Sequence, residues 1–161
     1  MASDSAVEPA APTYLEDFRV GQRFTSRSYL IDAAEIKEFA AKFDPQPFHL
    51  DEAAAVNSYF QGLAASGWHT AGITMRLMVE CMPKTPGGLL GAGGEITWPR
   101  ATRPGDELHV ACEIVGVRES RSKPDRGLVT FCAETLNQAG EPVQVFKGTM
   151  VAWRRIAATD S

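Results

Sequence analysis

The sequence predicts an α+β fold in which one curved antiparallel β-sheet wraps around one long buried helix. Three observations lead to this prediction. Residues 67–82 are apolar on almost every side of a helix, as in a helix that is buried all round. From residue 95 onward the apolar residues recur with a period of two, which indicates strands. Turn signals at 103–106 and 137–140 separate these strands, so they are expected to form an antiparallel meander.

The chain before the long helix is expected to begin with a strand and a helix. Residues 24–31 have the composition of a strand. Asp32 then has the spacing of an N-cap, with Glu35 completing a capping box. One apolar helical stripe follows and consists of Ile36, Phe39, Ala40 and Phe43. The helix should end at Phe43, because a residue that precedes proline, here Asp44, avoids the α region.

A second short helix is expected from Asp51 to about Tyr59, and its expected inner face is Val56, Tyr59 and Phe60. Ser66 is a suitable N-cap for the long helix. Trp68 and Met75 on that helix are expected to lie in the core or to line a tunnel. A glycine-rich link, 87–94, precedes the expected strands, which are 95–99, 107–118, 127–136 and 142–154.

Composition is that of a single globular domain. The chain has 161 residues, of which 44% are hydrophobic and 22% charged, enough for one sizeable core. The net charge of −4 argues against a nucleic-acid binder, and no apolar run approaches the roughly 18 residues of a membrane span. Three cysteines without metal-binding or disulfide spacing favour a reducing, cytoplasmic location.

The domain is expected to occupy residues 13–155. Residues 1–12 are rich in Ala, Pro and Ser and lack the basic start and apolar stretch of a signal peptide, so we expect a disordered lead-in. Residues 156–161 are expected to form a flexible tail.

The segment 43–51 is the most informative part of the sequence. It holds an acid, Asp44, and an imidazole, His49, in a link that Pro45 and Pro47 stiffen. A carboxylate and a histidine on a rigid segment can converge on one water molecule, as general acid–base chemistry requires. The same spacing also fits a helix end followed by the N-cap of the next helix, with His49 present for structural reasons. From the residues alone, both interpretations stay open.

The order of elements and two motifs resemble the hotdog fold of the MaoC-like dehydratases and R-specific enoyl-CoA hydratases. The signature of that family, Asp-x-Asn-Pro-x-His, is matched at 44–49 by Asp-Pro-Gln-Pro-Phe-His. The small-residue turn that opens the central helix in the family is matched at 65–69 by Ala-Ser-Gly-Trp-His. This resemblance covers residues 14–155 and favours the catalytic interpretation of the acid and the histidine.

The resemblance implies a hydro-lyase that adds water to a 2-enoyl-CoA thioester or removes it from a 3-hydroxyacyl-CoA thioester. Asp44 and His49 are then the acid–base pair. The N–H of Gly67, at the start of the central helix, would meet the charge that develops on the thioester oxygen. Further candidates for binding the substrate are Ser66, Gln46 and Trp68.

Coenzyme A is part of the implied substrate, so no cofactor is expected. The three scattered histidines, at 49, 69 and 109, predict no metal site. The resemblance also implies a homodimer that forms through the sheets, or a higher oligomer, with no nucleic-acid or membrane partner. The basic turn at 118–126 has two interpretations, a contact with coenzyme A phosphates or a solvated charged turn.

The sequence departs from the family at Gln46, which stands where the family usually has Asn. Two alternative functions stay open. One is an acyl-CoA thioesterase, because proteins with the hotdog fold also hydrolyse acyl-CoA; it would aim water at the thioester carbon rather than at Cβ. The other, which the departure at Gln46 keeps open, is a non-catalytic module that binds acyl thioesters.

Overall fold

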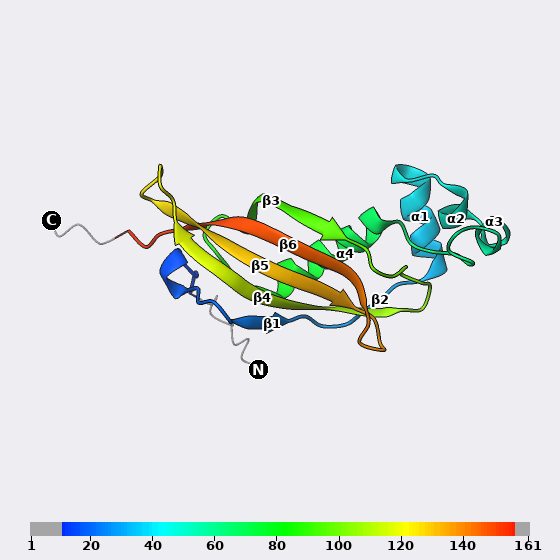
Figure 1. Cartoon of the computed structure of the whole chain (residues 1–161), viewed down its shortest axis with the longest axis horizontal. Helices are drawn as coiled ribbons and strands as arrows, with labels where there is room; N and C mark the ends of the chain where they lie inside the picture. The colour runs from blue at the N-terminus through cyan, green and yellow to red at the C-terminus, as the bar shows by residue number, and fades with distance from the viewer. Residues whose placement is uncertain (1–10, 157–161) are drawn as a thin grey trace, which may run out of the picture.

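The computed structural model describes residues 11–156, and its centre is an antiparallel sheet with a long helix along one face (Figure 1). The elements in chain order are η1 (Leu15–Asp17), β1 (Arg23–Thr25), β2 (Tyr29–Leu30), α1 (Ala33–Phe43), α2 (Pro47–Leu50), α3 (Glu52–Val56), α4 (Gly67–Cys81), β3 (Leu90–Thr97), β4 (Glu107–Glu119), β5 (Arg126–Leu136) and β6 (Pro142–Trp153). The predicted fold class, a hotdog domain, is confirmed.

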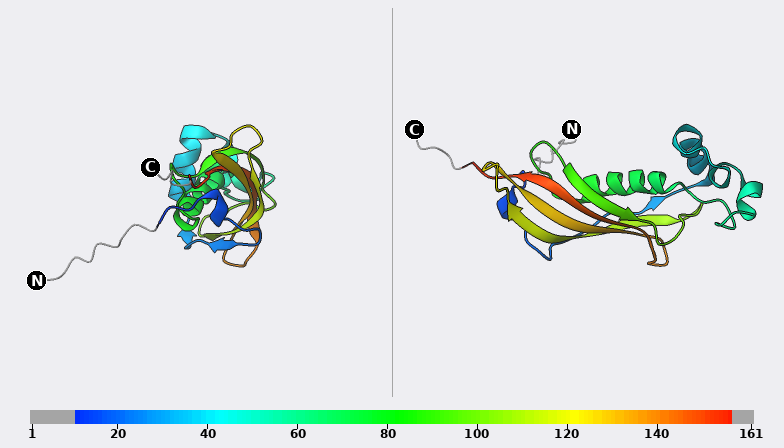
Figure 2. Two further views of the ribbon diagram at one scale, coloured as in Figure 1. Left: turned by 90° about the vertical axis from the view of Figure 1, so that its left-hand side faces the viewer. Right: turned by 45° about the horizontal axis from the view of Figure 1, so that its top comes forward.

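The sheet has the strand order β1-β4-β5-β6-β3, and β2 extends the β1 side by pairing with β4. Its register shifts once between β4 and β5, once between β5 and β6, and once between β3 and β6. Such irregularities increase the local bend and twist of a sheet. The long strands accordingly curve around α4, as both views of Figure 2 show.

The core lies between α4 and the concave face of the sheet. On β4 the buried residues alternate along the strand and are Leu108, Val110, Cys112 and Ile114. This alternation confirms the strand predicted from period-two spacing. From α4, the fully or nearly fully buried side chains of Ile73, Leu77 and Met78 belong to the same core cluster.

The helices α1, α2 and α3 lie beyond one end of the sheet, whereas the β4–β5 hairpin lies at the other end (Figures 1 and 2). Helix α1 begins as predicted, because the Asp32 side chain accepts from the N–H of Glu35 at 2.8 Å. The Glu35 carboxylate does not complete the capping box. It accepts instead from the Tyr29 hydroxyl and lies 3.4 Å from His69 Nε2.

The predicted strand 24–31 is wrong as one element. Two short strands, β1 and β2, flank Ser26, whose N–H donates to the carbonyl of Val110. The Ser26 hydroxyl oxygen in turn accepts a hydrogen bond from the N–H of Val110 at 2.8 Å. A side-chain oxygen therefore stands where a backbone carbonyl would continue the ladder, and the strand is interrupted.

The short helix predicted from Asp51 to Tyr59 is shorter than expected. Of its predicted inner face, Phe60 does pack inward, against Phe48, but Val56 and Tyr59 were wrongly assigned. The Asp51 side chain does cap it, but α3 ends at Val56. Val56 and Tyr59 are 60% and 95% exposed, while Ala55 is buried. The Ser58 hydroxyl donates to the carbonyl of Ala55 at 2.7 Å and so closes the helix end.

Two other element boundaries differ from expectation. A single helical turn, α2, forms inside the 43–51 segment, with Pro47 at its first position, where proline is well tolerated. Strand β3 begins at Leu90 and ends at Thr97, so part of the glycine-rich link belongs to the sheet. Its register shifts between Gly91 and Gly93, where glycine accommodates the irregular backbone.

Helix α4 spans the predicted range and begins at the predicted cap, since Ser66 Oγ accepts from the N–H of Trp68 at 3.2 Å. The expectation that it is buried on all sides is wrong. Trp68, Met75 and Val79 are exposed, because the sheet covers only one side of the helix (Figure 2).

The predicted lead-in, 1–12, and tail, 156–161, lie almost wholly outside the described residues. Among residues 11–156, none of the helices has the length and hydropathy needed to cross a bilayer.

Candidate active site

The fold brings Asp44 and His49 face to face. Helix α1 ends at Phe43, as Pro45 demands, and leaves Asp44 at its C-cap. The turn of α2 then directs His49 back toward it. His49 Nε2 lies 3.3 Å from Asp44 Oδ2, and the histidine is only 4% exposed. The pair is therefore a buried contact rather than two neighbouring surface groups.

A backbone carbonyl orients the His49 ring. His49 Nδ1 lies 2.7 Å from the carbonyl oxygen of Ala64. A carbonyl only accepts hydrogen bonds, so Nδ1 carries the proton. In the neutral ring this leaves Nε2 as an acceptor that faces Asp44.

Asp44 is held by two donors. Gln46 Nε2 donates to Oδ1 and Ser66 Oγ donates to Oδ2, each at 2.7 Å. Burial alone raises the pKa of the Asp44 carboxyl, but these two hydrogen bonds and the adjacent His49 ring outweigh it. The pKa therefore lies below its ordinary value, and the carboxylate is ionised at neutral pH.

The geometry suits a shared water molecule. When the His49 ring is neutral, its Nε2 and Oδ2 of the Asp44 carboxylate are both acceptors, so they do not satisfy each other. A water molecule has two O–H donors and can satisfy both atoms at once. Two acceptors on one water orient its lone pairs outward and increase the negative charge on its oxygen. This arrangement can activate water for addition.

Ser66 and Gly67 link the pair to the N-terminus of α4. The Ser66 hydroxyl both caps the helix and donates to Asp44, so it serves the helix and the pair together. Gly67 is the first residue of α4, so its N–H has no acceptor within the helix. That N–H and the helix dipole favour negative charge next to the Asp44–His49 pair.

A cleft of about 350 Å³ lies beside these groups. Of the predicted site residues, Gln46, His49 and Gly67 line it, whereas Asp44 and Ser66 are not among its lining residues. The remaining lining residues are Phe48, Tyr59, Phe60, Ala65, Thr70, Trp98, Arg100, Ala101 and Thr102. The lining therefore combines aromatic rings, the N-terminus of α4 and one cation, Arg100.

Trp68 does not lie where it was expected. It is 63% exposed and is not among the residues that line the cleft. Its ring instead packs edge-on against that of Trp98, with 5.6 Å between centroids. The reason is its position on α4, on the side that the sheet leaves open.

Trp98 is the main site residue that sequence reasoning missed, because a tryptophan near a strand has the pattern of ordinary packing. Its indole lies directly over Gly67, where a Cβ atom would come within 2.7 Å of the ring. Its Nε1 donates to Oε1 of Gln144, a fully buried residue, at 2.9 Å. Position 67 thus requires glycine, because any side chain there would collide with the Trp98 ring. Trp98 in turn closes one side of the site.

The other histidines and the basic turn lie apart from this cleft. His69 is buried against Glu35 and stacks on Phe39, with 4.6 Å between ring centroids. His109 is half-buried on β4 and is not among the residues that line the cleft. The basic turn, 118–126, is at the end of the sheet opposite to α1–α3 (Figure 1), so within one chain it does not border the cleft.

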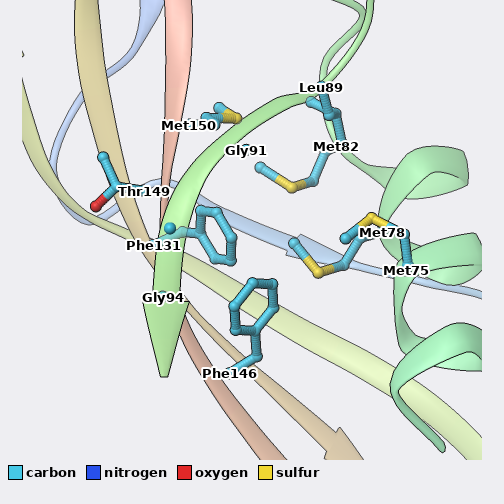
Figure 3. A pocket seen from close by; sticks show the side chains of 11 residues that line it. Met75, Met78, Met82, Leu89, Gly91, Gly94, Phe131, Phe146, Thr149 and Met150 are labelled. Carbon is cyan, nitrogen blue, oxygen red and sulfur yellow. The ribbon is translucent and has the colours of Figure 1, made fainter. Parts of the chain in front are cut away.

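A second cavity of about 320 Å³ lies between α4 and the sheet (Figure 3). Met75 and Met78 project from α4 toward Phe131 and Phe146 across it. No charged residue lines it. Within residues 11–156, no group of three or more His, Cys, Asp or Glu side chains is arranged to hold a metal ion.

The chain is similar in sequence to known proteins. The family model described as "FAS1-like, dehydratase domain region" matches residues 19–146. YdeM of Bacillus subtilis, an uncharacterized protein, is 33% identical over 139 residues, which are 84% of this chain and 94% of that protein.

Solved structures are also similar. The crystal structure of a MaoC-like dehydratase from Rhodospirillum rubrum shares 54% identity with a TM-score of 0.86, over 90% of this chain and 99% of that one. The R-hydratase PhaJ1 from Pseudomonas aeruginosa is 22% identical with a TM-score of 0.69, over 92% of each chain. At this lower identity the likeness concerns the fold.

Proposed function

From the premise that this chain belongs to the FAS1-like dehydratase family and is a MaoC-like hotdog hydratase or dehydratase, we propose that it hydrates 2-enoyl-CoA thioesters or dehydrates the corresponding 3-hydroxyacyl-CoA. The single observation that carries the proposal is the close approach of Asp44 Oδ2 and His49 Nε2, 3.3 Å apart, beside the first N–H of α4.

The proposed hydration adds a water oxygen to Cβ and a proton to Cα. The Asp44–His49 pair holds the water and takes one of its protons as the oxygen bonds to Cβ. The π electrons of the Cα–Cβ double bond shift toward the thioester oxygen. The pair then returns one proton to Cα, so neither side chain is consumed.

In this proposal the thioester oxygen accepts from the N–H of Gly67. The charge on that oxygen grows during addition, so a fixed donor at a helix N-terminus stabilises the transition state more than the ground state. Trp98 stands over the same glycine, so it shields this hydrogen bond from water.

Gln46 does not break the arrangement. Its amide is one methylene longer than the Asn usual in the family, yet Nε2 still reaches Asp44 Oδ1 at 2.7 Å. This contact gives Gln46 the role of a donor that keeps Asp44 ionised and oriented. It supports hydration over a non-catalytic binding module.

The chain is further proposed to act as a cytoplasmic homodimer with an acyl-CoA substrate. Strand β3 lies at the sheet edge, and Met75 and Val79 of α4 are exposed. An open edge strand and apolar helix residues are features that a second copy can cover. The three free cysteines agree with a reducing compartment.

Incubation with crotonyl-CoA tests the proposal. We expect the enoyl absorbance to fall without release of free thiol, whereas thiol release would indicate a thioesterase. Asp44→Asn and His49→Ala should each lower kcat about 10²- to 10⁴-fold, the usual contribution of general acid–base catalysis.

Two matched variants control for this test. Asp51→Asn keeps a good N-cap on α3, and His109→Ala removes a histidine that lies away from the cleft. Both should retain the activity of the unaltered chain. Undiminished hydration by Asp44→Asn and His49→Ala would refute the assignment of the pair.

A further inference from the structure

The Arg103 side chain holds the loop that leads to α4. Arg103 is in the turn between β3 and β4, and its Nη1 donates to the carbonyl oxygens of Gly62 and Leu63 at 2.9 and 3.2 Å. Its Nη2 donates to the carbonyl oxygen of Phe60. These partners are backbone carbonyls rather than carboxylates. The planar guanidinium therefore acts as a cross-link across loop 60–63.

This loop follows a path that needs external support. Gln61 has a φ of 53°, in the left-handed region that side chains other than glycine adopt at a cost. Gly62 follows with a φ of 152°, and a Cβ atom there would lie 3.5 Å from Arg103 Nη1. The guanidinium and the loop backbone are thus in close contact.

Loop 60–63 is followed directly by Ala64, whose carbonyl orients the His49 ring. Ala64 O lies 2.7 Å from His49 Nδ1. The N–H of Ala65 donates to the carbonyl of Thr102 at 2.9 Å. Because Thr102 adjoins Arg103 in the chain, these two residues together position the peptide that faces the His49 ring.

We propose that Arg103 is a positioning residue that selects the tautomer of His49 by fixing the Ala64 carbonyl. Its kinetic consequence rests on the proposed function, whereas the tautomer is a property of the protein without substrate. Without the cross-link, Ala64 and Ala65 keep their own N–H hydrogen bonds to the carbonyls of Phe48 and Thr102, but the loop before them is released, so the Ala64 carbonyl is less firmly placed and the ring proton can move to Nε2. That nitrogen then donates to Asp44 Oδ2, 3.3 Å away, and no longer accepts from water.

Selective ¹⁵N-histidine labelling of the full chain tests the proposal. The chain has only three histidines, so His69→Gln and His109→Gln variants assign the three rings in long-range ¹H–¹⁵N spectra. In the unaltered protein we expect the neutral His49 ring to carry its proton on Nδ1.

Two substitutions and a control complete the design. Arg103→Met should move His49 wholly or partly to the Nε2-protonated tautomer and lower kcat about 10²-fold, as misplaced catalytic groups do, with little change in KM. Arg103→Lys keeps the positive charge but lacks the planar guanidinium that reaches several carbonyls at once, so it should give an intermediate result. Arg23→Met removes an exposed arginine that pairs with Glu113 and should leave spectra and kinetics unchanged.

Two results would overturn the proposal: an unaltered protein with Nε2 protonated, or a folded Arg103→Met variant whose His49 spectrum is unchanged, even if its activity is reduced. If Arg103→Met does not fold, the spectrum of Arg103→Lys decides in the same way. An altered tautomer in a protein that never hydrates enoyl thioesters would support the role of Arg103 and refute the proposed function.

Discussion

At the scale of single residues, the site depends on hydrogen bonds that give each group one role. Ser66 shows this most clearly, because one hydroxyl accepts from the α4 backbone and donates to Asp44. The helix cap and the acid–base pair therefore share an atom. A change in the position of α4 would move the donor of Asp44, so helix and site are mechanically coupled.

Gly67 gives a prediction at this scale. Gly67→Ala would place a Cβ atom 2.7 Å from the Trp98 ring, so the indole must move off the α4 N-terminus. If Gly67 N–H binds the thioester oxygen, kcat/KM should fall about 10²-fold, because both this N–H and the Trp98 ring that shields it are displaced. Steady-state hydration of crotonyl-CoA measures this.

The matched control for Gly67 lies on the same helix. A Cβ atom at Gly72 would meet nothing within 4 Å, so Gly72→Ala should keep full activity. It should also raise the free energy of unfolding by about 0.5–1 kcal/mol, because alanine is the better helix former. Equal activity of Gly67→Ala and Gly72→Ala would show that the site does not need the space that glycine leaves at position 67.

At the scale of elements, helices α1 and α4 meet through a partly buried cluster around His69. His69 of α4 packs on Phe39 and lies 3.4 Å from Glu35, both of α1. The same carboxylate accepts from the Tyr29 hydroxyl of β2. The contact therefore ties three elements together next to the site, and it contains a titratable group.

This cluster predicts how stability depends on pH. Burial lowers the pKa of His69 below its ordinary value of 6.5, and this outweighs the opposite influence of Glu35. The unfolded chain then binds the proton more readily than the folded one. The free energy of unfolding is fully retained above the ordinary pKa and falls as pH drops toward the folded value.

Urea unfolding at neutral and mildly acidic pH measures this contribution. The His69→Gln variant should lose less stability between the two conditions than the unaltered protein, because it no longer titrates there. A His69→Gln variant with the same pH dependence as the unaltered protein would contradict the prediction.

At the scale of the whole molecule, one side of the domain is left uncovered. The sheet covers α4 on one side only, and β3 at the sheet edge is exposed along nearly its whole length. The apolar cavity of Figure 3 lies under this strand. These features are compatible with the homodimer proposed above.

Val79→Lys tests this pairing. Val79 is 46% exposed, so lysine there should leave the fold of one chain intact but add a charge to the proposed interface. Sedimentation velocity at micromolar concentration should show a dimer for the unaltered protein and monomers for the variant. Val20→Lys, at a valine that is 66% exposed in a turn, should remain dimeric. A monomeric unaltered protein would exclude the dimer.

What the sequence by itself determined is the part of the protein that depends on near neighbours. The end of α1 at Phe43, the cap at Ser66 and the strands β4 to β6 follow from proline, capping and period-two rules, which act over a few residues. The two short motifs, at 44–49 and 65–69, likewise indicated Asp44, His49, Ser66 and Gly67 as the candidate site.

Only the tertiary structure decided what distant segments contribute. The acceptor of His49 Nδ1 lies 15 residues away, and the Trp98 indole that covers Gly67 is held by Gln144, 46 residues further along the chain. Neither contact leaves a local pattern in the sequence. The open side of α4 is likewise invisible in its composition, because burial depends on how far the sheet extends around the helix. Such features arise from packing between elements, which is settled only when the chain folds.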